Sequence, residues 1–265
     1  MRTRSDTAAD TLASGAPIDA IVVTHDSAED VARLAASEPT RSSFRRIIVV
    51  DNDSSDRTRD LAADAGFEVH RQATNMGFAA AANVGARLSD TPVFALLNPD
   101  VRVADLGGVA RLAAQLVDPQ VGAVAPGLVL RDGSLQDSAR RVPTPTDLIV
   151  RRFADRQPDA VRATTPVDVD WAVGACLLLR RSAFDRVNGF DERYFLYFED
   201  VDLGVRLRAA GYRLRYVPTV RVFHDHGAAS RSGITSPATR RHIRSALRFY
   251  AHHPTCLVRR PGGRS

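Results

Sequence analysis

The segment IDAIVVTHDSAEDVARLAASEPTRSSFRRIIVVDN, residues 18–52, decides the fold class. It opens with a run of β-branched residues, continues with apolar residues spaced as on one face of a helix, and closes on a second β-branched run. Two buried strands joined by a helix form a crossover unit, in which the strands run parallel. The segment therefore predicts the first unit of an α/β protein.

The same alternation continues through residue 98. Strands are expected at 67–72 and 92–98, and helices at 54–66 and 75–89. Continuous apolar strands that alternate with helices predict a mostly parallel central sheet flanked by helices. In such sheets ligands bind outside the carboxyl ends of the strands. Polar residues stand at these ends, namely Thr24, His25, Asp26, Asp51, Asn52, Asp53, Asn98 and Asp100.

The pattern changes after residue 105. The proline- and arginine-rich segment 138–170 has weak periodicity, so it is interpreted as a long loop over a site. The other elements expected are a helix at 106–118, a hairpin at 121–136, a strand at 169–181, a strand pair at 213–227 and a helix at 236–254 that begins at Ser236.

Composition excludes several classes of chemistry. All 36 basic residues among the 265 are arginine. The chain therefore has no lysine side chain to form a Schiff base or to bind phosphate in a P-loop. The dinucleotide fingerprint G-x-G-x-x-G is absent after the first strand, which argues against a dehydrogenase. Two cysteines give no disulfide framework, and no window is apolar enough to span a membrane. A cytoplasmic location is expected.

The two ends of the chain differ from the middle. Residues 1–17 lack the apolar core of a secretory signal and are expected to be a disordered leader. From Arg221 onward the chain has nine arginines and a single acid. Such a tail can contact an anionic membrane, or it can be only a solvated helix face. The expected organisation is a leader, a main domain at 18–232, and a basic helix and tail at 233–265.

The stretch YFLYFEDVDLGVRL, residues 194–207, sets three carboxylates beside a run of aromatic residues. Acidic residues favour the first turn of a helix, and a carboxylate next to apolar surface can also take or give a proton. Partial desolvation should raise the pKa of Asp200, which suits a base. Asp202 and Arg206 are spaced as an ion pair on a helix surface.

Four other segments carry polar or small residues in suggestive places. Asp51 ends a strand and can accept from the N3–H of a uracil or thymine ring, although DNDSSD is also typical turn and cap sequence. Asp100 with substrate phosphates is a common way to hold Mg²⁺ or Mn²⁺, and a simple turn is the alternative. His224 weakly suggests a ligand. The small residues of 75–85 permit either close approach of a ligand or tight packing.

Taken together, these segments resemble a family 2 glycosyltransferase of the GT-A fold. The matching segments run in order from residue 18 to 230: VVTHD, VDNDSSD, NMGFAAAANVG, LLNPDV, the long stretch from GACLLL to RAAGY, and VFHDHGAAS. The resemblance comes closest to the bacterial rhamnosyltransferase-like branch. It implies transfer of a sugar from a pyrimidine nucleotide donor to a hydroxyl, with inversion and with Mg²⁺ or Mn²⁺.

The resemblance also implies roles for particular residues. Asp200 would be the general base, and Asp100 and His224 would be the metal ligands. The donor-binding residues would be His25, Asp51, Asp53, Asn75, Gly77, Asn83 and Asn98. The acceptor-binding residues would be Trp171, Gly174 and Glu199. Asn98 stands where such enzymes usually carry the first Asp of a triplet, which lowers the charge at the metal.

The expected substrates follow from the same resemblance. The donor is expected to be dTDP-rhamnose, and the acceptor a glycan or a polyprenyl-diphosphate-linked sugar in cell-envelope polysaccharide synthesis. The alternatives are a catalytically inactive nucleotide-sugar-binding relative and a transferase that uses a UDP-hexose. No nucleic acid partner is expected, because the basic tail lacks interleaved aromatic residues. Peripheral contact with the inner face of the membrane would pass through that tail.

Overall fold

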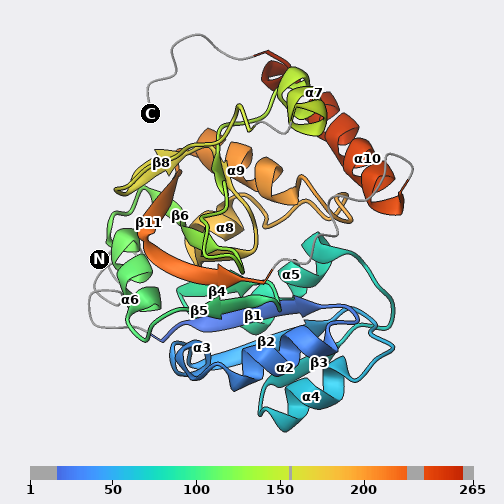
Figure 1. The fold of residues 1–265 in the computed structure, drawn as a ribbon, viewed down its shortest axis with the longest axis vertical. Helices are drawn as coiled ribbons and strands as arrows, with labels where there is room; N and C mark the ends of the chain where they lie inside the picture. The colour runs from blue at the N-terminus through green and yellow to red at the C-terminus, as the bar shows by residue number, and fades with distance from the viewer. Residues whose placement is uncertain (1–16, 155–156, 226–235, 259–265) are drawn as a thin grey trace.

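The computed structural model describes residues 17–154, 157–225 and 236–258. Its centre is a nine-stranded sheet in the order β3-β2-β1-β4-β10-β6-β11-β5, with β8 paired to β11 (Figure 1). Residues 1–16 of the predicted leader lie outside the described residues. Within the described ranges, no helix is both long and apolar enough to span a bilayer.

The first half of the sheet is built from parallel crossover units, as predicted. Strands β1 to β4 run parallel, and each crossover passes through at least one helix. The carboxyl ends of these strands therefore meet at one edge of the sheet. The strands are β1 (Asp19–Thr24), β2 (Arg46–Asp51), β3 (Glu68–Arg71) and β4 (Val93–Leu97), and the helices are α2 (Ala28–Ala36), α3 (Glu38–Ser42), α4 (Thr58–Asp64) and α5 (Phe78–Leu88).

The second half of the sheet mixes directions. Strand β10 runs antiparallel between β4 and β6, and β11 runs parallel to β6. Strands β5 and β8 are antiparallel to β11. The strands are β5 (Val101–Val103), β6 (Val121–Val129), β8 (Val167–Val169), β10 (Cys176–Arg180) and β11 (Arg213–His224). The predicted class, an α/β fold with a central sheet flanked by helices, is confirmed.

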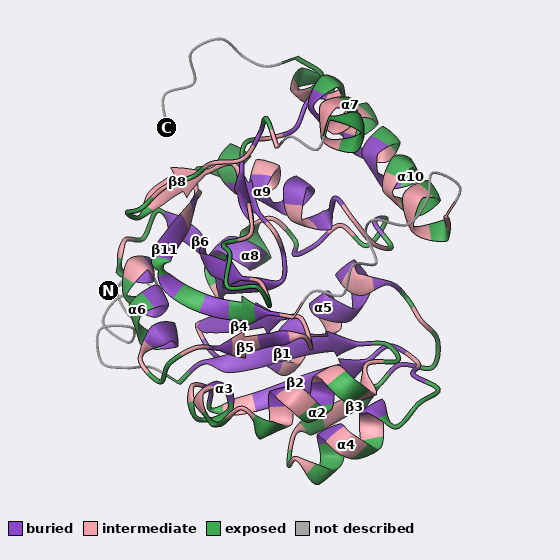
Figure 2. Ribbon diagram, in the orientation of Figure 1, coloured by how far each residue is buried: buried purple, intermediate pink, exposed green. Residues whose placement is uncertain are grey.

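Helices cover both faces of the sheet. Successive residues of β1 alternate between the two faces: Ala20 and Val22 pack with α2 and α6, and Ile21 packs with α5. Figure 2 shows the strands buried between these helix layers. The remaining elements on the two faces are α6 (Gly108–Ala114) with the 3₁₀ turn η1 (Gln115–Val117), α8 (Arg181–Arg186) and α9 (Glu199–Ala209).

Two expectations for the second half are wrong, and a third is confirmed only in part. The predicted hairpin at 121–136 is limited to its end, where Leu130 N donates to Ser134 O and Gln136 N to Leu128 O, both at 2.9 Å, whereas most of β6 pairs with β10 and β11. The predicted strand pair at 213–227 is one long strand with an irregularity between Val217 and Arg221. The predicted strand at 169–181 is broken into β9 (Trp171–Ala172) and β10.

The segment predicted as a long loop also has regular structure. It contains β7 (Ala139–Arg140), α7 (Pro145–Phe153) and β8. Helix α7 begins with a complete capping box, in which Thr144 Oγ1 accepts from the backbone N–H of Asp147 and the Asp147 carboxylate accepts from the backbone N–H of Thr144. Proline fits the first helical position, because an N–H there would have no hydrogen-bond partner within the helix and proline has none to leave unpaired.

The C-terminal helix joins the main body of the protein. α10 (Pro237–His252) begins at Ser236, whose Oγ accepts from Thr239 N at 3.1 Å, and the 3₁₀ turn η3 (Pro254–Cys256) follows it. Phe249 of α10 lies in one buried cluster with Trp171 and Phe198. The helix predicted to start a separate basic tail therefore shares a core with the domain.

We expect Gly85→Ala to destabilise the protein. A Cβ at this position in α5 would overlap the Ile21 Cγ2 methyl and lie 3.1 Å from the Val50 Cγ2 methyl. Both methyls belong to stiff β-branched residues of a packed sheet, so the free energy of unfolding should fall by about 1–3 kcal/mol. Urea unfolding measures this.

The matched control is Gly108→Ala at the start of α6. There a Cβ meets its closest neighbour, Val220 Cγ1, at an ordinary 3.5 Å. The better helix propensity of alanine should leave stability unchanged or raise it by up to about 1 kcal/mol. Equal effects of the two substitutions would contradict the packing described for α5.

Candidate active site

The loops after β1 and β2 are joined by hydrogen bonds. The Asp26 carboxylate accepts from Ser55 N at 2.7 Å and from Ser55 Oγ at 3.1 Å, and Asp26 N donates to Ser54 Oγ at 3.0 Å. The Ser55 N–H is the main cause that lowers the pKa of Asp26. Asp26 and Asp53 both have positive φ, 47° and 65°, a conformation that this network holds in place.

Asp51, predicted to bind the base, lies beneath these loops. It is fully buried, and its carboxylate accepts from Ser54 N at 3.1 Å and from Thr24 Oγ1 at 3.2 Å. Arg59 Nη1 lies 3.6 Å from Asp51 Oδ2, the oxygen that accepts from Ser54 N. These contacts are those of the turn-capping alternative, and base recognition by Asp51 stays a prediction.

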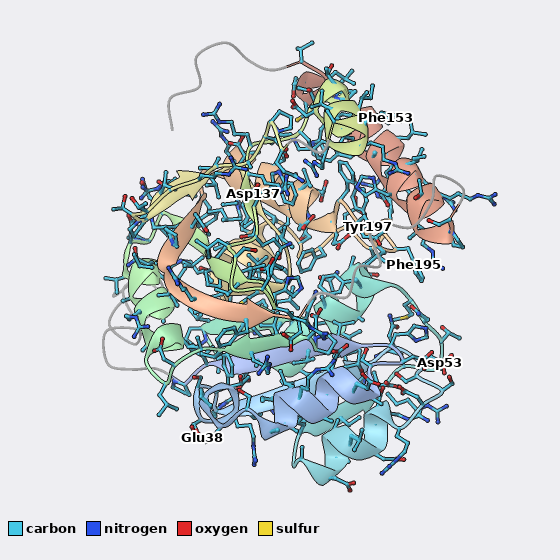
Figure 3. The ribbon with its side chains drawn as sticks, viewed as in Figure 1. Glu38, Asp53, Asp137, Phe153, Phe195 and Tyr197 are labelled. Atoms are coloured by element: carbon cyan, nitrogen blue, oxygen red, sulfur yellow. The ribbon has the colours of Figure 1, made fainter. Side chains whose placement is uncertain are left out.

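Two other predicted donor residues lie on the surface of the same loops. His25 is about half exposed, 3.9 Å from Asp26, and Asp53 is partly exposed. Figure 3 places Asp53 on the same side of the molecule as Phe195 and Tyr197. These loops and the segment that precedes α9 therefore border one region at the edge of the sheet.

Asn75 and Gly77 hold the start of α5. Asn75 Oδ1 accepts from Asn52 Nδ2 at 2.9 Å and from Gly77 N at 3.0 Å. Gly77 has φ +85°, and a Cβ there would overlap the carbonyl of Phe195, which accepts from Phe78 N at 2.8 Å. Only glycine permits this approach, so it brings the donor-side loop against the segment before α9.

The structure separates Asn83 from the other predicted donor residues. Its side-chain amide is buried, with Nδ2 donating to Phe190 O at 2.9 Å and to Glu192 Oε1 at 3.0 Å. Its Oδ1 accepts from Phe190 N at 2.9 Å. The amide thus ties α5 to the turn before residue 194, a structural role that sequence spacing alone could not distinguish from ligand binding.

Asp200 stands in the first turn of α9 and faces the start of β10. Its Oδ2 accepts from Gly174 N at 3.1 Å and its Oδ1 from Val201 N at 2.8 Å. One residue beyond Gly174, the Ala175 carbonyl accepts from Asn98 N at 2.8 Å. Asp200 is therefore connected, through the β9–β10 connection, to the carboxyl end of β4.

Both carboxyl groups at the start of α9 have raised pKa values. Burial is the main cause for Asp200, and the Gly174 N–H partly opposes it. Burial also raises the pKa of Glu199, and the charge of neighbouring Asp200 raises it further. The Gly174 N–H stabilises the ionised form of Asp200, whereas Glu199 Oε2 has no hydrogen bond within the described residues. Asp200 is thus the more easily ionised of the two.

Two residues with strained backbone conformations immediately precede α9. Tyr197 and Phe198 have φ of 71° and 69°, in the left-handed region that bulky residues rarely adopt. The His242 ring of α10 packs against both, with centroid distances of 5.4 Å and 5.3 Å. Burial lowers the pKa of His242 to about 4, so this ring is neutral when it packs. These contacts from α10 were not predicted.

Asp202 is not on a helix surface, and that prediction is wrong. Its side chain is 2% exposed and accepts from Arg206 Nε at 2.6 Å, which confirms the predicted pair. His253, just beyond α10, lies 2.8 Å from the other carboxylate oxygen. Arg206 also donates to the carbonyls of Val187 and Gly189. The pair thus anchors α9 to its neighbours.

Asp100 and His224 meet where β4 and β11 end. His224 is buried, and its Nε2 lies 3.5 Å from Asp100 Oδ2. Its Nδ1 lies 2.8 Å from Gln136 Oε1, and an Nδ1–H that donates to this oxygen leaves the Nε2 lone pair directed at a carboxylate. That donor set suits a divalent cation. No group of three potential ligands occurs within the described ranges, and His226 lies outside them.

Trp171 packs against α9. Its side chain is buried, and its Nε1 donates to the carbonyl of Arg141 at 2.8 Å. A Cβ on Gly204 of α9 would lie 2.9 Å from the Trp171 Cβ, so the helix packs closely on it. Of these two predicted acceptor-binding residues, Trp171 packs against α9, whereas Gly174 contacts Asp200 directly.

The fold and the placement of these groups define a GT-A glycosyltransferase. The family described as "Glycosyl transferase family 2" matches residues 19–187, and "Glycosyl transferase family group 2" matches residues 144–249. The chain therefore belongs to glycosyl transferase family 2, in its rhamnosyltransferase-like branch. The predicted class of enzyme is confirmed.

Curated relatives support this branch. The chain is 34% identical over 238 residues to N-acetylglucosaminyl-diphospho-decaprenol L-rhamnosyltransferase of Mycobacterium tuberculosis, covering 81% of this chain and 77% of the relative. It is 30% identical over 244 residues to rhamnosyltransferase WbbL of Escherichia coli, covering 87% and 91%.

Solved structures show the same fold at low identity. GalNAc-T7 with UDP, GalNAc and Mn²⁺ aligns with TM-score 0.64 and 17% identity, over 93% of this chain and 52% of that chain. The mannosyltransferase PcManGT from Pyrobaculum calidifontis, in complex with GDP-Man and Mn²⁺, aligns with TM-score 0.56 and 17% identity, over 96% and 84%. The predicted GT-A fold is confirmed.

We expect Glu199→Gln to change how stability depends on pH. The folded-state pKa of Glu199 is raised, so the folded protein holds this proton at pH values where the unfolded chain, with an ordinary pKa near 4.5, has lost it. The free energy of unfolding should therefore fall as pH rises above 4.5. Glutamine cannot ionise, so the variant should lose part of this slope in urea unfolding across pH. Identical slopes for wild type and variant would contradict the raised pKa.

Proposed function

We propose that the chain transfers L-rhamnose from dTDP-L-rhamnose, with inversion, to a hydroxyl of a polyprenyl-diphosphate-linked glycan. The observation that carries the proposal is Asp200, a desolvated carboxylate held by Gly174 N–H next to the end of β4, beyond which Asp100 meets His224. The sugar and the acceptor are supported by the relative whose name states both.

Asp200 acts as the general base. It removes the proton of the acceptor hydroxyl as the oxygen attacks the anomeric carbon, and its raised pKa makes it a better proton acceptor than an exposed aspartate. The new C–O bond forms on the face opposite the departing diphosphate, so the anomeric centre inverts. One base positioned against one hydroxyl suffices, and no covalent glycosyl-enzyme is needed.

Asp100 and His224 hold a divalent cation, Mg²⁺ or Mn²⁺, in this proposal. The His224 Nε2 lone pair facing a carboxylate at 3.5 Å supports the assignment. When bound, the cation offsets the charge that develops on the leaving diphosphate. Two protein ligands are enough, because Mg²⁺ and similar ions take their remaining ligands from substrate phosphates and water.

The donor nucleotide lies over the loops after β1 and β2. We assign contact with it to His25, which is exposed there, to Asp53, which is partly exposed, and to the backbone around Asn75 and Gly77. Asp51 serves this site by fixing the loop that carries Asp53. Asn98 holds the end of β4 through its backbone, ahead of Asp100. Glu199 lies next to the base, on the acceptor side.

We expect Asp200→Asn to lower kcat/KM about 10²–10⁴-fold, because the amide keeps an acceptor for Gly174 N–H but cannot take a proton. The raised pKa of Asp200 also sets the sign of the pH dependence. Wild-type activity should fall as pH decreases through a pKa above the ordinary aspartate value of 3.8. Initial rates measured across pH provide both results.

The matched control for this test is Asp185→Asn, which changes an exposed carboxylate on α8. It should retain the wild-type rate and pH profile. If Asp200→Asn remained active while folded, Asp200 would not be the base.

The donor and the metal are tested together by calorimetry. Wild-type protein is titrated with dTDP-rhamnose, UDP-glucose, UDP-galactose and GDP-mannose, each with and without Mn²⁺. We expect Mn²⁺ to strengthen binding of dTDP-rhamnose, and Asp100→Ala or His224→Ala to abolish the strengthening, because each removes a ligand. Asp132→Ala, in an exposed turn, is the control and should behave as wild type.

Each other outcome has a definite meaning. Metal-dependent binding of a UDP-hexose instead would overturn the donor assignment and retain the glycosyltransferase. Failure of a folded protein to bind any donor would favour the catalytically inactive relative. Mn²⁺ dependence that survives in both ligand variants would overturn the metal site.

A further inference from the structure

Helices α7 and α10 expose apolar side chains to solvent. On α7, Ile149 is 59% and Phe153 is 75% exposed, and on α10, Ile243 is 51% and Leu247 is 68% exposed. Each pair is four residues apart, so each forms a stripe along its helix. Large apolar side chains exposed on neighbouring elements mark a surface that contacts a partner or a membrane.

The two helices lie together on one side of the domain. Tyr250 Oη of α10 donates to the carbonyl of Pro143, just before α7, at 3.0 Å, and Leu148 of α7 packs on the cluster that contains Phe249. Figure 1 shows α7 beside α10 at the outer edge, and Figure 3 shows Phe153 there. The buried face of α10 is formed by Ser245, Ala246 and Phe249, which leaves the stripe of Ile243 and Leu247 uncovered.

Exposed arginines accompany these apolar side chains. Arg240 and Arg244 of α10 and Arg152 of α7 are exposed, and α10 contains no acidic residue. The one acid of α7, Asp147, is buried in the capping box. A helical surface with apolar residues and arginines but without exposed acids is typical of helices that lie in the interface of anionic membranes.

We propose that Ile149, Phe153, Ile243 and Leu247, with the adjoining arginines, form a docking face for the surface of an anionic lipid bilayer. The charge favours this occupant over a second copy of the chain, because two copies would bring like charges together across the contact. The face involves α7 as much as the basic C-terminal segment. This proposal rests on the proposed function in one respect, which is that the acceptor is lipid-linked.

The docking face adjoins the acceptor side of the site. His242, between Arg241 and Ile243 on α10, packs against Tyr197 and Phe198, which immediately precede Glu199 and Asp200. Ser245 Oγ donates to the Leu196 carbonyl at 2.9 Å, and His253 contacts Asp202 of α9. A bilayer that holds α10 therefore lies next to the segment that delivers the base, where a lipid-linked hydroxyl has to arrive.

The test is sedimentation of the full-length chain with phosphatidylcholine vesicles, with and without phosphatidylglycerol. We expect wild type to bind the anionic vesicles, and less so at high salt, because salt screens the arginine contribution. The double variant Phe153→Ser, Leu247→Ser should lower the partition coefficient at least about tenfold, since two exposed apolar anchors are removed. Leu106→Ser, which removes an exposed leucine ahead of α6, is the control and should bind as wild type.

Two outcomes overturn the proposal. In the first, the double variant binds the anionic vesicles as wild type does, or wild type does not bind them. In the second, sedimentation velocity shows a wild-type dimer that the double variant dissociates, which makes the face a contact between copies.

Activity separates this proposal from the proposed function. The double variant should retain wild-type rates with a short-chain, water-soluble acceptor and lose rate only with the same glycan on a polyprenyl diphosphate in vesicles. Equal loss with both acceptors overturns the proposal, because a docking face has no effect without a membrane. Inactivity of wild type with both acceptors, together with vesicle binding as expected, refutes the proposed function and retains the docking face.

Discussion

The hydrogen bond from Gly174 N to Asp200 Oδ2, 3.1 Å long, connects the two parts of this site. One part is the sheet edge, where β1, β2 and β4 end in polar loops, and the other is helix α9, which is not one of the parallel crossovers. This contact acts together with the bond from Phe78 N to the Phe195 carbonyl, which joins the segment before α9 to the start of α5. A Cβ at position 174 would lie 3.6 Å from the Asp200 Cβ, an ordinary van der Waals distance, so the contact with Asp200 depends on the backbone N–H of Gly174.

The backbone conformation of the two residues before α9 costs free energy. Two consecutive aromatic residues in the left-handed region cost roughly 1–2 kcal/mol each, and Tyr197 and Phe198 keep that conformation because both pack against His242 and Phe198 also packs against Phe249. The rings thus offset the strain with buried aromatic contacts. Helix α10 therefore supports the start of α9, and the basic segment that was predicted to be separate packs against the residues that precede Glu199 and Asp200.

Local periodicity was sufficient to predict the strands and helices of residues 18–98 except the short α3, because crossover units are built from neighbouring segments whose apolar spacing reports their own burial. Periodicity failed where the secondary structure depends on pairing with segments that are distant in the sequence. The turn signal at Asp132 and Gly133 predicted a hairpin, but only the end of β6 takes part in it, because the strand is central to the sheet and pairs with β10 and β11. The prolines of 138–170 concealed α7, although Thr144 and Asp147 formed a capping signal. For the site, the sequence predicted roles for Asp200, Asp100 and His224 that stay predictions. The burial of Asp202 near His253 and the internal use of the Asn83 amide could not be predicted, because they depend on contacts with distant segments.

The two carboxyl groups at the start of α9 show how position separates chemically similar residues. Both lie at a helix N-terminus, where the helix dipole favours negative charge, and both are desolvated, which opposes it. Asp200 has Gly174 N–H and its own helix N–H groups to stabilise the ionised form, whereas Glu199 has the charge of Asp200 beside it. Ionisation of Asp200 therefore disfavours ionisation of Glu199, so Glu199 stays protonated over a wider range of pH than Asp200 does. A single backbone N–H, provided by the connection between β9 and β10, is the main difference between them.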